Sequence, residues 1–127
     1  MMEEKKYNTV VAELCYKNQI TNITFNSAEM TLEQAKSHAD DIRREFKDVL
    51  PLLCLSNISA LKKVSKEARD YLGLPEMMEI VKVNAIIANS TLSKIVGNLF
   101  LMFSKPIIPT KIFTDEAAAL AWLQQFK

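Results

Sequence analysis

The chain has 127 residues, with 16 basic and 15 acidic side chains and therefore a formal net charge of +1. That length suits one domain over residues 1–127, and 49% hydrophobic with 24% charged residues is typical of a folded globular protein. The near-zero charge argues against nonspecific nucleic-acid binding, which needs a concentrated basic surface. Two glycines are too few for a P-loop or a dinucleotide fingerprint, and one histidine with two separated cysteines makes no zinc-finger pattern. We therefore expect no metal and no cofactor.

Two stretches bear on the cellular compartment. The start of the chain, residues 1–7, has no apolar core after its charged residues and does not look like a signal peptide. The most apolar stretch, residues 95–103, is interrupted by Gly97 and Asn98 and falls short of the roughly 20 residues that a membrane-spanning helix needs. The sequence therefore predicts a cytoplasmic protein without a membrane span.

The first half of the chain changes from strand-like to helix-like patterning. Two runs rich in β-forming residues, 10–16 and 19–25, are separated by Lys17-Asn18, which predicts an N-terminal hairpin. A capping box, with Thr31 as N-cap and Gln34 three residues on, predicts the start of an amphipathic helix that runs to Phe46.

The second half alternates apolar strand-like runs with helical segments. Serine caps are expected at Ser65 and Ser90, and a threonine cap at Thr114. The order ββαβαβαβα predicts an α/β single domain, in which a mixed, mostly parallel sheet follows the hairpin. The expected strands are 52–55, 79–88 (strongest over 83–88) and 107–113, and the expected helices are 66–72, 90–103 and one after residue 114.

The end of the chain runs from Lys105-Pro106 through an apolar strand to Phe113, a short acidic cap and an alanine-rich helix with Trp122-Leu123. This pattern resembles the end of bacterial SpoIIAA-like proteins. The buried strand 52–55, the Ser-Lys-Glu-Ala-Arg helix and the apolar helix after strand 83–88 also fit. The resemblance implies a STAS or CRAL-TRIO type of α/β fold, with helices largely on one side of a sheet.

Anti-sigma factor antagonists of this wider group switch partners when a serine at a strand–helix junction is phosphorylated. Their Asp-Ser-Ser-Gly motif is absent here, where residues 55–61 read Leu-Ser-Asn-Ile-Ser-Ala-Leu. Ser56 and Ser59 are the candidates for such a phospho-switch. A phosphate at this junction would meet backbone N–H groups and a helix dipole, although serine is also a common structural cap.

The helix that begins after Ser90 is more apolar than a surface helix requires. Residues 99–103 are five consecutive apolar residues, so the apolar surface extends beyond one face. Two methionines after Pro75 add adaptable apolar surface. The surplus either packs into the core, forms a homodimer interface or lines an apolar ligand pocket. The candidate residues are Leu99, Leu101, Met102, Phe103, Met77 and Met78.

We expect a non-enzymatic regulatory domain that works by protein interaction, with an unidentified protein partner and a homodimeric state. The alternative is a carrier of a lipid or another apolar small molecule in a CRAL-TRIO-like pocket. No catalytic set is expected, because the single histidine, His38, has no evident partner nucleophile and is read as a partly exposed structural residue. A closed apolar cavity of ligand size distinguishes the two hypotheses, because a carrier needs one and a switch does not.

Overall fold

A computed structural model describes residues 3–127, apart from the side chains of residues 103 and 104. The strands are β1 (Glu4–Asn8), β2 (Ala12–Lys17), β3 (Ile20–Phe25), β4 (Glu29–Met30), β5 (Leu52–Asn57), β6 (Lys63–Val64), β7 (Val81–Ile87) and β8 (Thr110–Phe113). The α-helices are α1 (Leu32–Glu45), α2 (Lys66–Leu72), α3 (Thr91–Leu99) and α4 (Glu116–Gln124). Short 3-10 turns at Lys47–Val49 and Pro75–Glu79, and a π-helical turn at Phe100–Ser104, complete the helical segments.

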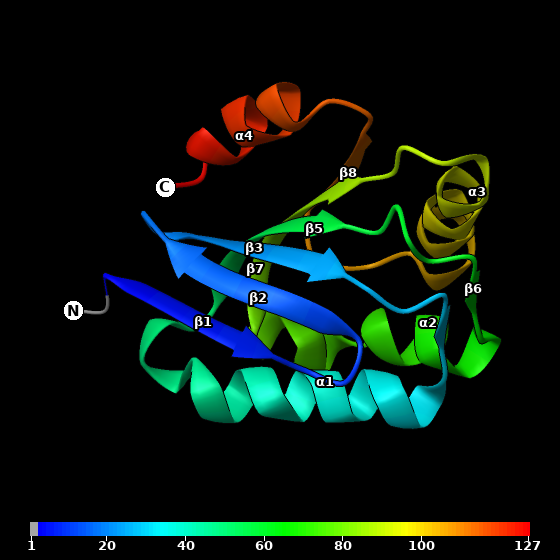
Figure 1. The fold of residues 1–127 in the computed structure, drawn as a ribbon, viewed down its shortest axis with the longest axis horizontal. Coiled ribbons are helices and arrows are strands. Elements are labelled where there is room, and N and C mark those ends of the chain that lie inside the picture. Colours follow the sequence, from blue (N-terminus) through cyan, green and yellow to red (C-terminus); the bar gives the residue numbers. More distant parts are fainter. Residues whose placement is uncertain (1–2) are drawn as a thin grey trace.

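One six-stranded sheet, in the order β1-β2-β3-β5-β7-β8, forms the centre of the fold (Figure 1). β2 runs antiparallel to both β1 and β3, whereas β3, β5, β7 and β8 run parallel to one another. The short strands β4 and β6 form a second, two-stranded sheet. The expected α/β fold with an antiparallel start and a mostly parallel sheet is confirmed.

Helices cover both faces of the six-stranded sheet. In Figure 1, α1 and α2 lie below the sheet, α4 lies above it and α3 stands at its right-hand end. The larger core joins the lower face to residues of α1, α2 and α3, such as Ile42, Ala68 and Val96. The smaller core joins the upper face to α4 through Ala119 and Leu123. The face covered by α1–α3 is called the inner face below.

The antiparallel part of the six-stranded sheet has three strands, β1–β3, one more than the predicted hairpin. β1 pairs along its length with β2, and its side chains alternate between exposed and half-buried. The sequence of β1 is polar because β1 is an edge strand, and only part of its surface packs on α1. The predicted turn at Lys17-Asn18 is also wrong by one residue. Asn18 and Gln19 take the positive φ values of 54° and 69°, because Lys17 still pairs with Ile20.

Three of the four predicted helix caps are confirmed. Thr31 and Gln34 form the capping box of α1, and Ser65 and Ser90 accept hydrogen bonds from backbone N–H groups of α2 and α3. The fourth is wrong, because Asp115 rather than Thr114 caps α4: its carboxylate accepts from two backbone N–H groups. A carboxylate at this position also interacts favourably with the helix dipole.

The apolar helix predicted over 90–103 changes its geometry part of the way along. It is α-helical only to Leu99 and continues as a π-helical turn over Phe100–Ser104. Lys105 then ends it with a left-handed backbone at φ 44°. A π-helical turn widens the helix by one residue, which redistributes the run of apolar side chains that the sequence places here.

Candidate functional site

A cavity of about 130 Å³ lies between the inner face of the sheet and the helices α1–α3. Its wall is largely hydrocarbon and is assembled from segments far apart in the sequence. Aliphatic or aromatic side chains reach it from β3, α1, the loop after β5, the turn before β7, β7 itself and the π-helical turn. Representative members in that order are Ile23, Ile42, Ile58, Met77, Ile86 and Phe100.

Small side chains leave this space open. Ala39 of α1 is 1% exposed and lines the cavity, as does Gly97 of α3. A Cβ atom added at Gly97 would lie 3.0 Å from the Cδ1 atom of Ile112 on β8, so α3 approaches the sheet closely at this point. A larger residue at either position would fill the cavity or push a helix away from the sheet.

Three polar residues of the sheet, Ser56, Asn84 and Thr110, line the cavity, and the Thr110 hydroxyl donates to the carbonyl of Ile108 at 2.8 Å. The Ser56 hydroxyl donates a hydrogen bond to Oδ1 of Asn84 at 2.7 Å, which joins β5 to β7 on the inner face. Ser56 is buried, but Asn84 is half-buried although its strand lies between β5 and β8. Because neighbouring strands flank it on both sides, the accessible part of Asn84 faces the cavity.

Arg69 supplies the one cationic side chain among the described residues that line the cavity. Its Nε atom is buried and has no hydrogen-bond partner among the residues that the structure describes. No aspartate or glutamate belongs to the described lining of the cavity. A buried N–H donor without a partner is costly, so the hydrogen bonding of this side chain is incomplete among the described residues.

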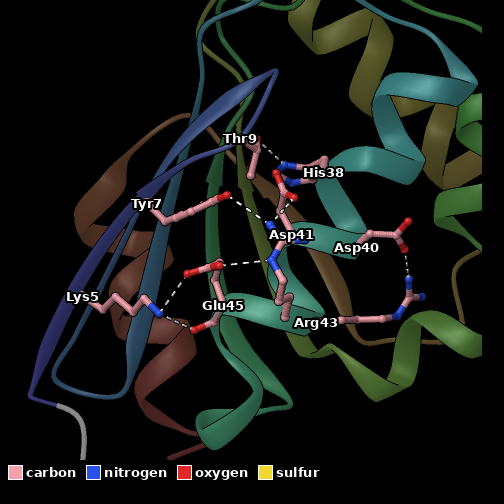
Figure 2. Close-up of polar contacts among 9 residues, drawn as sticks. Lys5, Tyr7, Thr9, His38, Asp40, Asp41, Arg43 and Glu45 are labelled. Carbon is pink, nitrogen blue, oxygen red and sulfur yellow. Dashed lines mark hydrogen bonds and ion pairs between the residues drawn. The ribbon is translucent and has the colours of Figure 1, made fainter.

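His38 lies on the cavity-facing side of α1 and is buried rather than partly exposed. Its Nδ1 atom is 2.8 Å from the hydroxyl of Thr9 (Figure 2). The centroid of its ring lies 5.3 Å from that of Phe25. Burial lowers the pKa of His38 to about 4, and the nearby carboxylate of Asp41 opposes this shift only in part. The imidazole is therefore neutral at pH 7.

A ladder of polar contacts fastens β1 to the outer side of α1, as Figure 2 shows. The ammonium of Lys5 lies 3.3 Å from Oε1 of Glu45, and Arg44 donates to the Tyr7 hydroxyl at 3.1 Å. Arg44 also pairs with Asp41 at 2.7 Å. Arg44 is exposed and its partners are half-buried, and these groups bind one another, so we interpret the ladder as structural rather than as a reactive centre.

The two candidate switch serines occupy different environments. Ser56 is inside the cavity wall, with its hydroxyl engaged by Asn84. Ser59 is half-buried in the loop after β5, where its hydroxyl accepts a hydrogen bond from the backbone N–H of Asn89 at 3.1 Å. Its carbonyl accepts from the hydroxyl of Ser90 at 3.0 Å, so Ser59 is tied to the start of α3.

The apolar candidates divide between the cavity and the surface. Met77 is 3% exposed and lines the cavity, whereas Met78 is 52% exposed. Met102 is 61% exposed, and Leu99 and Leu101 are half-buried. The side chain of Phe103 lies outside the described part of the structure. With Leu92 and Ile95, which are also exposed, Leu99 and Met102 form an apolar stripe on the outer face of α3 and its π-helical turn.

Sequence reasoning missed Arg69 and Asn84 as site residues. Arg69 belongs to a short charged helix segment and reads as a solvated side chain. Asn84 is the polar residue in the middle of β7, flanked by buried Val83 and Ala85, and its position there is a signal that could have been used. A polar side chain in the middle of a buried strand needs a partner, and here that partner comes from β5.

The cysteines are free thiols in the described structure. Cys54 faces the cavity, and burial raises the pKa of its thiol to about 12, which keeps it protonated and unreactive at pH 7. Among the described residues, no cluster of histidine, cysteine, aspartate or glutamate could hold a metal ion. Within residues 3–127, no helix is long and apolar enough to cross a membrane.

Comparison with solved structures finds proteins of similar fold. An uncharacterized protein of the DUF3478 family from Shewanella loihica PV-4, with a SpoIIAA-like fold, superimposes with a TM-score of 0.61 at 18% sequence identity. The match covers 97% of this chain and 98% of that one. None of the curated proteins compared with the chain matches it. At the sequence level, a family model described as a domain of unknown function, DUF7793, matches residues 14–127. The chain thus belongs to the DUF7793 family and has a SpoIIAA-like fold.

Proposed function

We propose that this domain binds a small apolar molecule in the cavity between its sheet and α1–α3, and that it works by binding rather than by catalysis. The cavity itself carries the proposal, since a partly open space lined largely by hydrocarbon is what a carrier of a small apolar ligand needs. It favours the carrier hypothesis over the phospho-switch hypothesis. A partner switch works on the protein surface and gains nothing from a hollow core.

The size of the cavity limits the occupant. An engineered protein cavity of about 150 Å³ binds benzene or xenon and otherwise stays dry. The cavity here, at about 130 Å³, accommodates an apolar body of about that size. This argues for a small aromatic or short branched compound rather than a lipid with long acyl chains.

The chemistry of the lining supports binding rather than catalysis. His38 is neutral at pH 7, and its Nδ1 atom is engaged by Thr9. The Cys54 thiol has a raised pKa and is a poor nucleophile. The remaining polar groups can donate or accept hydrogen bonds, but the Ser56 hydroxyl has no adjacent general base in its hydrogen-bond network.

Methyl-resolved NMR with benzene as a neutral probe tests this function. We expect saturable shifts of the Ile23, Ile42 and Ile86 methyl groups, which line the cavity. The Ile20 and Leu55 methyl groups, which belong to the core under α4, are the internal control and should not shift. Absence of saturation, or equal shifts in both cores, would overturn the proposal.

A second candidate function is self-association through the outer face of α3, and the exposed stripe on that face supports it. Leu92 and Ile95 are 46% and 50% exposed on one side of the helix, and Met102 continues the stripe. Contiguous exposed apolar surface of this kind favours a protein contact. We propose a second copy of the chain as the partner.

Sedimentation equilibrium of Ile95→Lys tests the self-association. The charge should shift the wild-type assembly toward monomer, because a lysine ammonium would be buried without a partner at the interface. Val10→Lys is the matched control, since Val10 is 57% exposed in the turn between β1 and β2. A wild-type monomer, or equal effects of both variants, would contradict the interface.

A further inference from the structure

We infer that the occupant of the cavity is a small carboxylic acid whose carboxylate pairs with Arg69. This inference rests on the proposed function and names the chemical class of its ligand. It starts from a cation that lines an apolar cavity and has no counter-charge in the described lining.

Arg69 differs from other cations of the helical layer. Arg43 and Arg44 each pair with an aspartate of their own helix, at 2.8 and 2.7 Å. Lys66, one turn before Arg69 on α2, pairs with Asp70 at 2.7 Å. Among the described residues, Arg69 forms no such ion pair, and its Nε donor is buried without a hydrogen-bond partner.

A carboxylate satisfies this guanidinium better than a neutral group does. Its two oxygens match the planar fork of donors, and charge-assisted hydrogen bonds are shorter and stronger than neutral ones. A neutral carbonyl would accept a hydrogen bond from the guanidinium but would supply no counter-charge, and the described lining of the cavity supplies none either. Charge complementarity therefore selects an anionic head group.

The rest of the wall sets the shape of the ligand. The remaining lining is predominantly hydrocarbon, and the sheet adds the polar pair Ser56 and Asn84. Arg69 is half-buried, so an acid could place its head group beside this side chain and its apolar body against Ile42 and Ile86. The volume restricts that body to about the size of a benzene ring.

Benzoate and its neutral isostere benzamide provide the matched pair of probes. The dissociation constants of the two compounds are measured on the full chain by NMR titration of the cavity methyl groups. We expect benzoate to bind at least about tenfold more tightly than benzamide, the factor that one charge-assisted hydrogen bond supplies. Equal affinities, or a preference for benzamide, would overturn the inference.

Two variants test whether the preference for benzoate depends on Arg69 or on the positive charge of the surface in general. Arg69→Met should abolish the preference for benzoate while benzamide still binds. Lys66→Met removes a cation from the same helix without touching the cavity lining and should keep the preference. The wild-type comparison remains decisive if Arg69→Met does not fold. Retained preference in folded Arg69→Met would exclude Arg69 as the anchor.

Benzene separates failure of this inference from failure of the proposed function. If benzene shifts the cavity methyl groups but benzoate gains nothing over benzamide, the cavity binds apolar molecules and the carboxylate assignment is wrong. If none of the three probes shifts these methyl groups, the proposed function fails as well.

Discussion

The hydroxyl of Ser56 donates a hydrogen bond to Oδ1 of Asn84 at 2.7 Å across two neighbouring parallel strands. Both side chains lie on the inner face of the sheet, within an otherwise apolar wall. Each satisfies a polar atom of the other, so the pair can be placed in the core without a large desolvation cost. The remaining hydrogen-bonding capacity of the amide is then directed to the cavity.

Phosphomimetic variants at the two candidate serines should behave differently. Ser56→Asp places a carboxylate in the buried wall, and we expect it to lower the free energy of unfolding by about 3 kcal/mol or more at pH 7. Ser59→Asp lies in a half-buried loop and should cost less than about 1 kcal/mol. Urea unfolding of both variants measures the difference. Equal stabilities would show that Ser56 is more accessible than the structure indicates.

Alanine substitutions at the two isoleucines of β7 should distinguish the core that contains the cavity from the core under α4. Ile86 lines the cavity, and the next residue, Ile87, faces the core under α4. Each change to alanine removes a buried side chain and should cost about 2–5 kcal/mol. Only Ile86→Ala should enlarge the cavity and improve binding of a probe larger than benzene, such as naphthalene. Fluorescence titration with naphthalene checks this, and improved binding by Ile87→Ala would contradict the location of the site.

The stability of the fold should fall in mild acid because of His38. Burial lowers its pKa from the ordinary 6.5 to about 4 in the folded state, so the unfolded chain binds the proton more readily. The contribution is therefore complete above pH 6.5 and is lost as the pH falls toward 4. The difference of about 2.5 units corresponds to about 3 kcal/mol.

His38→Gln keeps a hydrogen-bonding group near Thr9 and removes this titration. Its free energy of unfolding should vary less between pH 6.5 and 4 than that of the wild type, as measured by urea unfolding at several pH values. Carboxylates that titrate in the same range are common to both proteins and cancel in the comparison. Identical pH profiles would contradict the burial of His38.

A larger side chain at Gly97 should weaken the packing of α3 against the sheet. Gly97→Leu pushes side-chain atoms toward Ile112 and Ile58 and should cost about 1–3 kcal/mol. Gly97→Ala should change stability by less than about 1 kcal/mol, because its contact with the flexible end of Ile112 offsets the gain in helix propensity. Asn98→Leu, exposed on the same helix, is the control and should be nearly neutral. A stable Gly97→Leu variant would contradict this close approach.

The sequence predicted the parts of the fold that depend on local patterns. Thr31, Ser65 and Ser90 cap helices as expected, because a hydroxyl before an apolar periodic run has a local partner in the backbone. The edge strand β1 escaped prediction, because charged residues dominate a strand that rests on α1 with one side only. Its position is fixed by tertiary contacts, such as that between Lys5 and Glu45.

The candidate site was harder to predict than the fold. Met77 and Met78 are adjacent in sequence, yet one lines the cavity and the other is exposed, because the 3-10 turn that carries them points them apart. The importance of Arg69 depends on which acidic residues lie near it in space, and sequence spacing cannot supply this. Asn84 is the exception, since its place in an apolar strand was visible from the start.

Isotope-filtered NOE spectroscopy of the labelled protein with unlabelled benzoate would locate the bound acid directly. We expect NOEs from the ring protons to the methyl groups of Ile42 and Ile86, inside the cavity. NOEs confined to Leu92 and Ile95 on the outer face of α3 would place the acid on the surface. That result, or a complete absence of intermolecular NOEs at saturating benzoate, would contradict a ligand site in the core of this domain.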